Sequence, residues 1–292
     1  MHIRRASFKE RTMQEPFQSD DAFLKDVAQR HAQPGLALWW LGQSGFLLMY
    51  QGRCALLDPY LSESLTEKYA KTDKPHVRMT RRVIDPCRLD FVSVTASTHN
   101  HTDHLDAQTL KPLLDVNPEM ALIVPEANRA FAADRLGLEI EAIVGAEEGR
   151  PIEVAGFSFQ AVPAAHETLE RDAAWRLTHV GYIVRAGSLT IYHSGDTVRY
   201  PGMAELLSTF DIDVALLPIN GRAPERRVAG NLNGLEAAQL AHDIGAKLVI
   251  PCHYDLFEFN TASPDTFVAE CERLGQRYQV LKNGACLDIP EE

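Results

Sequence analysis

Residues 97–106 have the sequence Ser-Thr-His-Asn-His-Thr-Asp-His-Leu-Asp, and this stretch decides how the rest of the 292-residue chain is interpreted. Three histidines and two aspartates fall within eight of its residues. Residues 91–95, just before it, alternate and are rich in β-branched side chains, which predicts a strand. The stretch therefore lies on the loop that leaves the C-terminal end of that strand.

The spacing of these side chains favours metal binding. Residues i and i+2 of an extended segment share a face, so His99 and His101 can point at one ion. Asp103 and His104 lie a turn further on and can hold a second ion. Imidazole and carboxylate groups are the ligands that Zn²⁺, Mn²⁺ and Fe²⁺ accept in open, reactive sites. A solvated polar loop is the alternative, but such a loop seldom carries four spaced ligands together with Asp106.

Composition and charge restrict the class of protein. Apolar residues make up 45% of the chain, as in ordinary soluble globular proteins, and no apolar run approaches the roughly 20 residues of a membrane span. The net charge of −11 argues against a nucleic-acid partner, because such proteins normally carry a basic face. The N-terminal sequence MHIRR lacks the apolar core of a signal peptide, and the five cysteines form no CxxC pair. We therefore expect a cytoplasmic protein that does not bind a membrane.

Periodicity and turn residues divide the chain into strands and helices. Strands are predicted at residues 36–41, 46–50, 54–57, 91–95, 121–125, 139–144, 151–154, 157–162, 182–185, 189–193, 214–219, 247–251 and 279–281. Helices are predicted at residues 20–28, 106–116, 126–136, 234–244 and 265–274. Residues 61–86 have weak periodicity and are interpreted either as a lid or binding loop or as a merely solvated insertion.

This order of elements suits two sheets packed face to face with helices outside, a four-layer αββα sandwich of the α/β class. The chain shows no linker, low-complexity tract or short-period repeat. We therefore expect a single domain over residues 1–292, with residues 1–33 as an N-terminal extension.

Three further candidate ligands, His166, Asp196 and His253, each follow the end of a predicted strand. Strand ends are where α/β proteins gather their functional residues. His193 lies three residues before Asp196 and is interpreted either as a buried core histidine or as a residue that supports the site or contacts the substrate. The other histidines lack such a context and are expected to be structural or on the surface: His2, His31, His76, His179 and His242.

The pattern His-x-His-x-Asp-His at residues 99–104, followed in order by His166, Asp196 and His253, resembles the sequence blocks of the metallo-β-lactamase superfamily. More closely, the chain resembles the L-ascorbate-6-phosphate lactonase branch of that superfamily over roughly residues 36–260. The motifs that carry this resemblance are WWLG at 39–42, THxHxDH at 98–104, YHSGD at 192–196, IDVAL at 212–216 and AKLVIPxH at 246–253. The chain differs from the lactonases around His166 and over residues 220–233, and it is shorter at its C-terminus.

The resemblance implies the αββα fold, a homo-oligomer and a site for two divalent metal ions, Mn²⁺ or Zn²⁺. It assigns the first ion to His99, His101 and His166, the second to Asp103, His104 and His253, and both to Asp196.

The activity that the resemblance implies is hydrolysis of a small molecule. A metal-bound hydroxide would open a sugar lactone, phosphorylated or not, such as L-ascorbate 6-phosphate. Asp103 or Asp196 would act as the catalytic residue that transfers the proton. A phosphodiesterase or nuclease on the same fold is the alternative, since it would share every ligand. A non-catalytic binding or structural protein is a third, although members of that kind have usually lost ligands.

A phosphate on the substrate would need cationic side chains to bind it. Arg222, Arg226 and Arg227 follow the predicted strand 214–219 and are the first candidates, with His193 as a further substrate contact. For each arginine an exposed surface position is the alternative. The second candidates are Arg81, Arg82 and Arg199.

Overall fold

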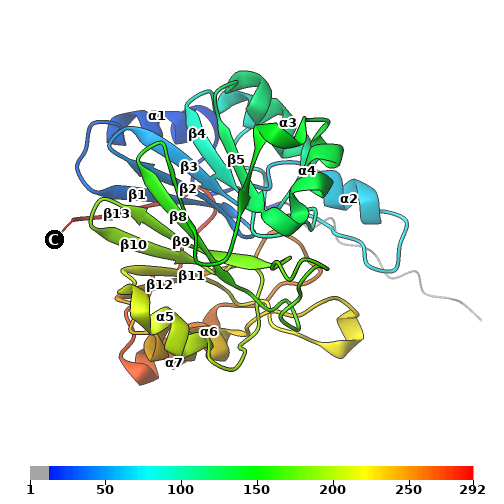
Figure 1. Ribbon diagram of the computed structural model, residues 1–292. Helices are drawn as coiled ribbons and strands as arrows, with labels where there is room; N and C mark the ends of the chain where they lie inside the picture. The colour runs from blue at the N-terminus through cyan, green and yellow to red at the C-terminus, as the bar shows by residue number, and fades with distance from the viewer. Residues whose placement is uncertain (1–12, 292) are drawn as a thin grey trace, which may run out of the picture.

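The computed structural model describes residues 13–291 and contains two β-sheets packed face to face, with helices on both outer faces (Figure 1). This is the αββα arrangement that the sequence predicts. Residues 1–12 of the predicted N-terminal extension, His2 among them, lie outside the described residues.

The first sheet has seven strands in the order β13-β1-β2-β3-β4-β5-β6. These strands are β1 (Leu36–Gly42), β2 (Gly45–Tyr50), β3 (Arg53–Leu57), β4 (Val92–Ala96), β5 (Ala121–Pro125), β6 (Ile143–Ala146) and β13 (Cys286–Ile289). The second sheet has six strands in the order β12-β11-β10-β9-β8-β7. These strands are β7 (Pro151–Val154), β8 (Phe157–Pro163), β9 (Val180–Ala186), β10 (Leu189–His193), β11 (Val214–Pro218) and β12 (Leu248–Cys252).

Parallel pairing brings the carboxyl ends of several strands to one edge of each sheet. Strands β3 to β6 run parallel in the first sheet, and strands β10 to β12 run parallel in the second. In open α/β sheets, ligands bind outside the carboxyl ends of the strands. The pairing therefore predicts that functional side chains gather at this edge.

The helices form the two outer layers (Figure 1). The first sheet is covered by α1 (Asp20–Arg30), α3 (Ala107–Val116) and α4 (Arg129–Leu136). The second sheet is covered by α5 (Met203–Leu207), α6 (Gly234–Asp243) and α7 (Asp265–Leu274). The short helix α2 (Ser64–Tyr69) lies in the 61–86 segment. None of the helices within residues 13–291 has both the length and the apolar character needed to cross a membrane.

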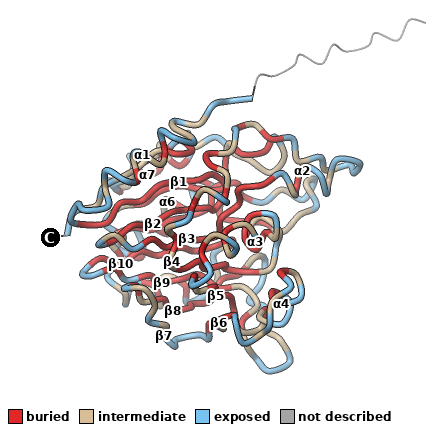
Figure 2. Tube along the Cα trace, turned by 90° about the horizontal axis from the view of Figure 1, so that it is seen from above, coloured by how far each residue is buried: buried red, intermediate tan, exposed pale blue. Residues whose placement is uncertain are grey.

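Strand β1 illustrates why the central strands are continuously apolar. Every residue of β1 is buried, and the strands are the most buried part of the trace (Figure 2). Leu38 and Trp40 belong to the core cluster that joins the two sheets, whereas Trp39 and Leu41 belong to the cluster beneath the outer helices. A sheet that is covered on both faces needs apolar side chains at successive positions.

Helix α1 falls within the predicted N-terminal extension, yet it belongs to the outer layer. Its buried residues, Phe23 and Val27, pack into the same cluster as Trp39. The ring centroid of Phe23 lies 6.2 Å from that of Trp39. The described part of the extension therefore contributes to the core of the first sheet.

Some predicted elements are wrong. Residues 140–142 form a 3₁₀ turn and the strand begins at Ile143, so the predicted strand 139–144 is displaced. Residues 279–281 form no strand. The sequence analysis also missed α5 and β13. Strand β13 is short, and three of its four residues are only partly buried at the edge of the sheet, so it lacks a clear hydrophobic pattern.

Candidate metal centre

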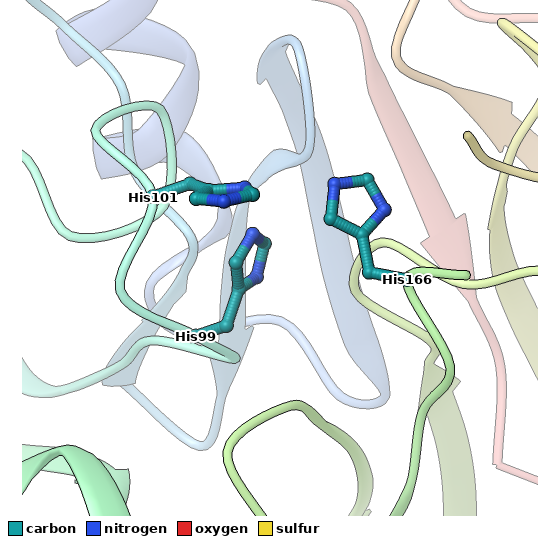
Figure 3. A group of neighbouring side chains, drawn as sticks. All are labelled: His99, His101 and His166. Carbon is teal, nitrogen blue, oxygen red and sulfur yellow. The ribbon is translucent and has the colours of Figure 1, made fainter. Parts of the chain in front are cut away.

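The seven predicted ligands come together beyond the ends of β4, β8, β10 and β12. His99 and His101 project from the loop after β4, with ring centroids 4.6 Å apart. His166 follows β8, and its ring centroid lies 5.1 Å from that of His101. The three rings therefore surround a common space (Figure 3). The ligand atoms of three groups lie within 4.8 Å of one another. These groups are His99, His101 and His166; His99, His104 and Asp196; and Asp103, His104 and His253.

Asp196 lies at the middle of this cluster. One of its oxygens is 3.4 Å from His104 Nε2, and the other is 3.4 Å from His253 Nε2 and 3.6 Å from His166 Nε2. Burial disfavours the charged form, but His253 and His104 hold the pKa of Asp196 well below its usual range. Asp196 is therefore an ionised carboxylate, which is the form that binds metal.

Asp58 lies beneath the cluster and was missed by the sequence analysis. It is fully buried at the end of β3. Its carboxylate accepts hydrogen bonds from Thr98 N and Oγ1 at 2.7 Å each, from His104 Nδ1 at 2.7 Å and from His193 Nε2 at 2.8 Å. Burial alone would raise the pKa of Asp58, but His104 and His193 lower it. The available signal was an aspartate at the end of a buried strand, followed by proline.

In His99, His104 and His166 the Nδ1 atom makes a hydrogen bond, which leaves the Nε2 atom available to a metal ion. His104 Nδ1 donates to Asp58, and His166 Nδ1 donates to the carbonyl of Gly230 at 3.0 Å. Thr98 Oγ1 uses its own hydrogen on Asp58, so it accepts from His99 Nδ1 at 3.1 Å.

Two buried Nε2 atoms without hydrogen-bond partners indicate that this set of donor atoms fits a metal ion. The Nε2 atoms of His99 and His104 are buried and have no hydrogen-bond partner among the described residues. Metal-ligating histidines typically donate one ring N–H to a carboxylate or carbonyl and present the other nitrogen to the ion. The nitrogen and oxygen donors of this cluster therefore fit a divalent metal such as zinc or manganese.

Gln43 also belongs to the site and was not predicted. It lies in the turn between β1 and β2 with a positive φ of 51°. Its Nε2 lies 2.9 Å from an oxygen of Asp103 and 3.1 Å from His253 Nε2. Asp106, by contrast, caps α3 by accepting a hydrogen bond from Gln108 N and lies outside the three ligand groups.

His179 was expected to be structural or on the surface, and its ring lies beside those of the candidate ligands. Its ring centroid is 4.9 Å from that of His99 and 5.8 Å from that of His166. Burial and the neighbouring His166 lower the pKa of His179 to about 4, so this ring is neutral at pH 7.

A cavity of about 490 Å³ lies over the cluster. Its floor includes His101, Asp103, His166, Asp196 and His253. One wall comes from the 61–86 segment, through Leu65, Lys68, Tyr69, Lys74 and His76. The volume suits a small molecule. The 61–86 segment therefore contributes side chains to the lining of this cavity, and the binding-loop interpretation stays a prediction.

Comparisons with known proteins agree with this geometry. The family model of the Beta-lactamase superfamily domain matches residues 53–254, more than half of the chain. A UPF0173 metal-dependent hydrolase of Methanoregula boonei is 32% identical over 258 residues, which cover 87% of this chain and 98% of that protein. A relative of the same description from Sulfolobus acidocaldarius is 27% identical over 86% of this chain and 99% of its own.

This chain belongs to the beta-lactamase superfamily.

A solved structure of the same fold is that of a possible metal-dependent hydrolase from Veillonella parvula. It superposes with a TM-score of 0.70 at 16% identity and covers 87% of this chain and 100% of that one. Superfamily membership confirms the predicted fold, and the curated relatives place the chain in a family of metal-dependent hydrolases. The assignment to the lactonase branch stays a prediction.

Of the four predicted substrate residues, one lines the cavity and three lie outside its lining. Arg227 lines the cavity, and its guanidinium pairs with Asp73. His193 is fully buried beneath the site on Asp58 and lies outside the cavity lining. Arg222 and Arg226 also lie outside that lining. Arg222 pairs with Glu236, and Arg226 donates to Asn220 O and Asn260 Oδ1. The second candidates form ion pairs elsewhere: Arg81 with Glu15, Arg82 with Asp85, and Arg199 with Asp243.

Proposed function

We propose that this protein is a hydrolase that uses two divalent metal ions, manganese or zinc, to open a phosphorylated sugar lactone such as L-ascorbate 6-phosphate. The first ion would be held by His99, His101 and His166, the second by Asp103, His104 and His253, and Asp196 would contact both. The observation that carries the proposal is the carboxylate of Asp196, which lies within 3.4–3.6 Å of the Nε2 atoms of three histidines from separate loops.

Divalent ions held by these residues would supply a water molecule that is deprotonated near neutral pH and would polarise the carbonyl under attack. Asp103 is the more exposed carboxylate, since 16% of its side chain is accessible against 5% for Asp196. His104 and His253 hold the pKa of Asp103 well below its usual range despite burial. Because Asp103 is the more exposed of the two carboxylates, we assign to it the transfer of a proton from the attacking water to the leaving alkoxide, and to Asp196 a fixed position between the histidines.

The lactone and its setting follow from the resemblance and are supported by two observations. The cavity of about 490 Å³ suits a sugar-sized substrate. All five cysteines are free, which suits a reducing cytoplasm. By the same resemblance we propose a homo-oligomer, for which light scattering after size exclusion gives the mass.

The test uses protein stripped of metal and reloaded with Mn²⁺ or Zn²⁺. Hydrolysis of L-ascorbate 6-phosphate is measured in parallel with hydrolysis of bis(p-nitrophenyl) phosphate. We expect turnover of the lactone that depends on the added metal. Turnover of the diester alone would overturn the lactone assignment in favour of a phosphodiesterase, and lactone turnover in the stripped protein would overturn the metal mechanism.

Replacing Asp196 by alanine removes the carboxylate that contacts three of the histidines. We expect hydrolysis to fall by more than ~100-fold, because even residues that only orient a metal ligand typically change affinity or activity by about 10–100-fold. The circular dichroism spectrum should stay that of the wild type. Asp243→Ala is the matched control, since this exposed aspartate pairs with Arg199 and belongs to none of the three candidate ligand groups. Equal activity of the two variants would contradict the assignment of Asp196.

A further inference from the structure

We propose that Lys68 and Arg135, together with Asn100 and Thr102, form a subsite for the phosphate group of the substrate. All four residues line the cavity over the candidate metal centre. None of them was among the predicted phosphate-binding residues. The inference rests on the proposed function for the identity of the whole substrate, but the subsite can be tested without turnover.

Arg135 is held beside the loop at residues 97–106 and forms no ion pair there, although the charge of Asp106 acts on it from nearby. Its Nη1 donates to the carbonyls of Asn100 at 2.7 Å and Leu105 at 2.9 Å, and its guanidinium lies 4.4 Å from the ring centroid of Phe131. No carboxylate of residues 13–291 forms an ion pair with it, and its other nitrogens make no hydrogen bond to a described residue. A half-buried, fixed guanidinium with unused donors suits binding of a phosphate oxygen.

Lys68 approaches the same short loop from a different helix. It lies on α2, and its Nζ is 3.4 Å from Thr102 Oγ1 and 5.2 Å from the ring centroid of Tyr69. It too forms no ion pair within the described part of the chain. Lys68 and Arg135 therefore bring two positive charges that form no ion pair with a described residue to residues 100–105.

The other arginines near the cavity already form ion pairs or hydrogen bonds within the protein. Arg227 pairs with Asp73 and Arg222 pairs with Glu236, and Arg226 donates to a side-chain amide and a backbone carbonyl. In a chain with a net charge of −11, two cations that line the cavity and form no ion pair with a described residue create a local field that attracts an anion.

The position of the subsite limits the size of the substrate. Asn100 and Thr102 directly flank His101 in the chain, and Thr102 directly precedes Asp103. A phosphate bound there lies next to the candidate ligands, so only a few bonds can separate it from the bond that is cleaved. This arrangement favours a small phosphate monoester and disfavours a polymer.

The first test compares substrates with and without phosphate on the metal-loaded protein. Lys68→Met removes a charge from an exposed side chain of similar length, and Arg135→Gln removes a charge but keeps donors for the two carbonyls. We expect each variant to raise KM for L-ascorbate 6-phosphate by about 10–100-fold, as expected for loss of a charge-assisted hydrogen bond, while KM for unphosphorylated L-ascorbate is unchanged. Lys111→Met, an exposed lysine on α3, is the control and should alter neither.

The second test does not depend on turnover. Inorganic phosphate is titrated calorimetrically into the Mn²⁺-loaded wild type and each variant, with metal content measured in parallel. All variants keep the candidate ligands, so phosphate binding to the ions is common to them. We expect weaker binding in Lys68→Met and Arg135→Gln only. Wild-type phosphate affinity and an unchanged KM in both variants would overturn the subsite even if the lactone is hydrolysed. Weakened phosphate binding without lactone turnover would support the subsite and overturn the proposed function.

Discussion

At the scale of single residues, the site depends on a carboxylate that does not face the cavity. Asp58 accepts four hydrogen bonds, two of them from histidines of different sheets. His104 comes from the loop after β4 in the first sheet, and His193 ends β10 in the second. One buried group therefore fixes the tautomer of His104 and joins the two halves of the site.

Asp58→Asn is expected to weaken metal binding. Oδ2 of Asp58 accepts from both His104 Nδ1 and His193 Nε2, and Oδ1 accepts from Thr98 N. Asparagine offers one acceptor oxygen in place of two, so its amide N–H would face either the two histidines or Thr98 N, and in both cases the negative charge beneath His104 is lost. The tautomer that frees His104 Nε2 then loses its support, and we expect metal affinity to fall by about 10–100-fold. Titration against a competing chelator measures this change. Asp85→Asn, a partly exposed aspartate that caps a short turn, is the control. Equal affinity of the two variants would show that Asp58 does not orient His104.

At the scale of elements, the start of α6 combines a local signal with a packing constraint. Asn233 and Glu236 form a capping box, with bonds of 2.9 and 3.0 Å. Gly234, the first residue of the helix, lies so close to α7 that a Cβ there would be 2.8 Å from the backbone nitrogen of Phe267. The cap is local in the sequence, whereas the need for glycine arises only from the neighbouring helix.

Gly234→Ala should destabilise the protein although alanine is the better helix former. Its helix propensity favours alanine by up to ~1 kcal/mol, but overpacking against Phe267 typically costs ~1–3 kcal/mol. We expect a net decrease in the free energy of unfolding, measured by urea denaturation. The adjacent Leu235 is exposed, so Leu235→Ala should change stability by no more than ~0.5 kcal/mol. A stabilised Gly234→Ala variant would mean that α6 and α7 can separate without loss.

At the scale of the whole molecule, hydrogen bonds connect the second sheet to the loop after β4 of the first sheet, which carries the candidate ligand His99. Tyr182 on β9 is fully buried and donates a hydrogen bond to the carbonyl of Ser97 at 3.0 Å. Val180 N, on the same strand, donates to the carbonyl of Thr98 at 3.1 Å. The loop that carries His99 is therefore held by both sheets, which explains why the candidate ligands meet where the sheets meet.

Tyr182→Phe removes one of these connections without changing the ring. The carbonyl of Ser97 would lose a buried partner, so we expect unfolding to require ~1–2 kcal/mol less free energy. Metal stoichiometry should stay unchanged, because Tyr182 is not a candidate ligand. Tyr278→Phe is the control, since the Tyr278 hydroxyl bonds to an exposed glutamate. If both variants unfold at the same denaturant concentration, the connection through Ser97 contributes nothing measurable.

Much of the fold was accessible from local patterns. The apolar run of β1, the cap of α6 and the spacing from His99 to His104 are set by residues that are neighbours in the chain. Such features carry their own periodicity or capping chemistry, so they could be predicted without knowledge of distant contacts. Strand β13 could not, because its four residues form a strand only by pairing with β1 across the whole length of the chain.

The same division holds for the site. The sequence alone determined a histidine- and aspartate-rich loop and three further candidate ligands, because each follows a recognisable strand. Only the tertiary structure brought in Asp58, Gln43 and His179, and only it separated the unpaired Lys68 and Arg135 from the paired Arg222. The physical reason is that a ligand's type is a property of one residue, whereas its orientation and the neutralisation of a charge depend on groups that folding brings within hydrogen-bonding distance.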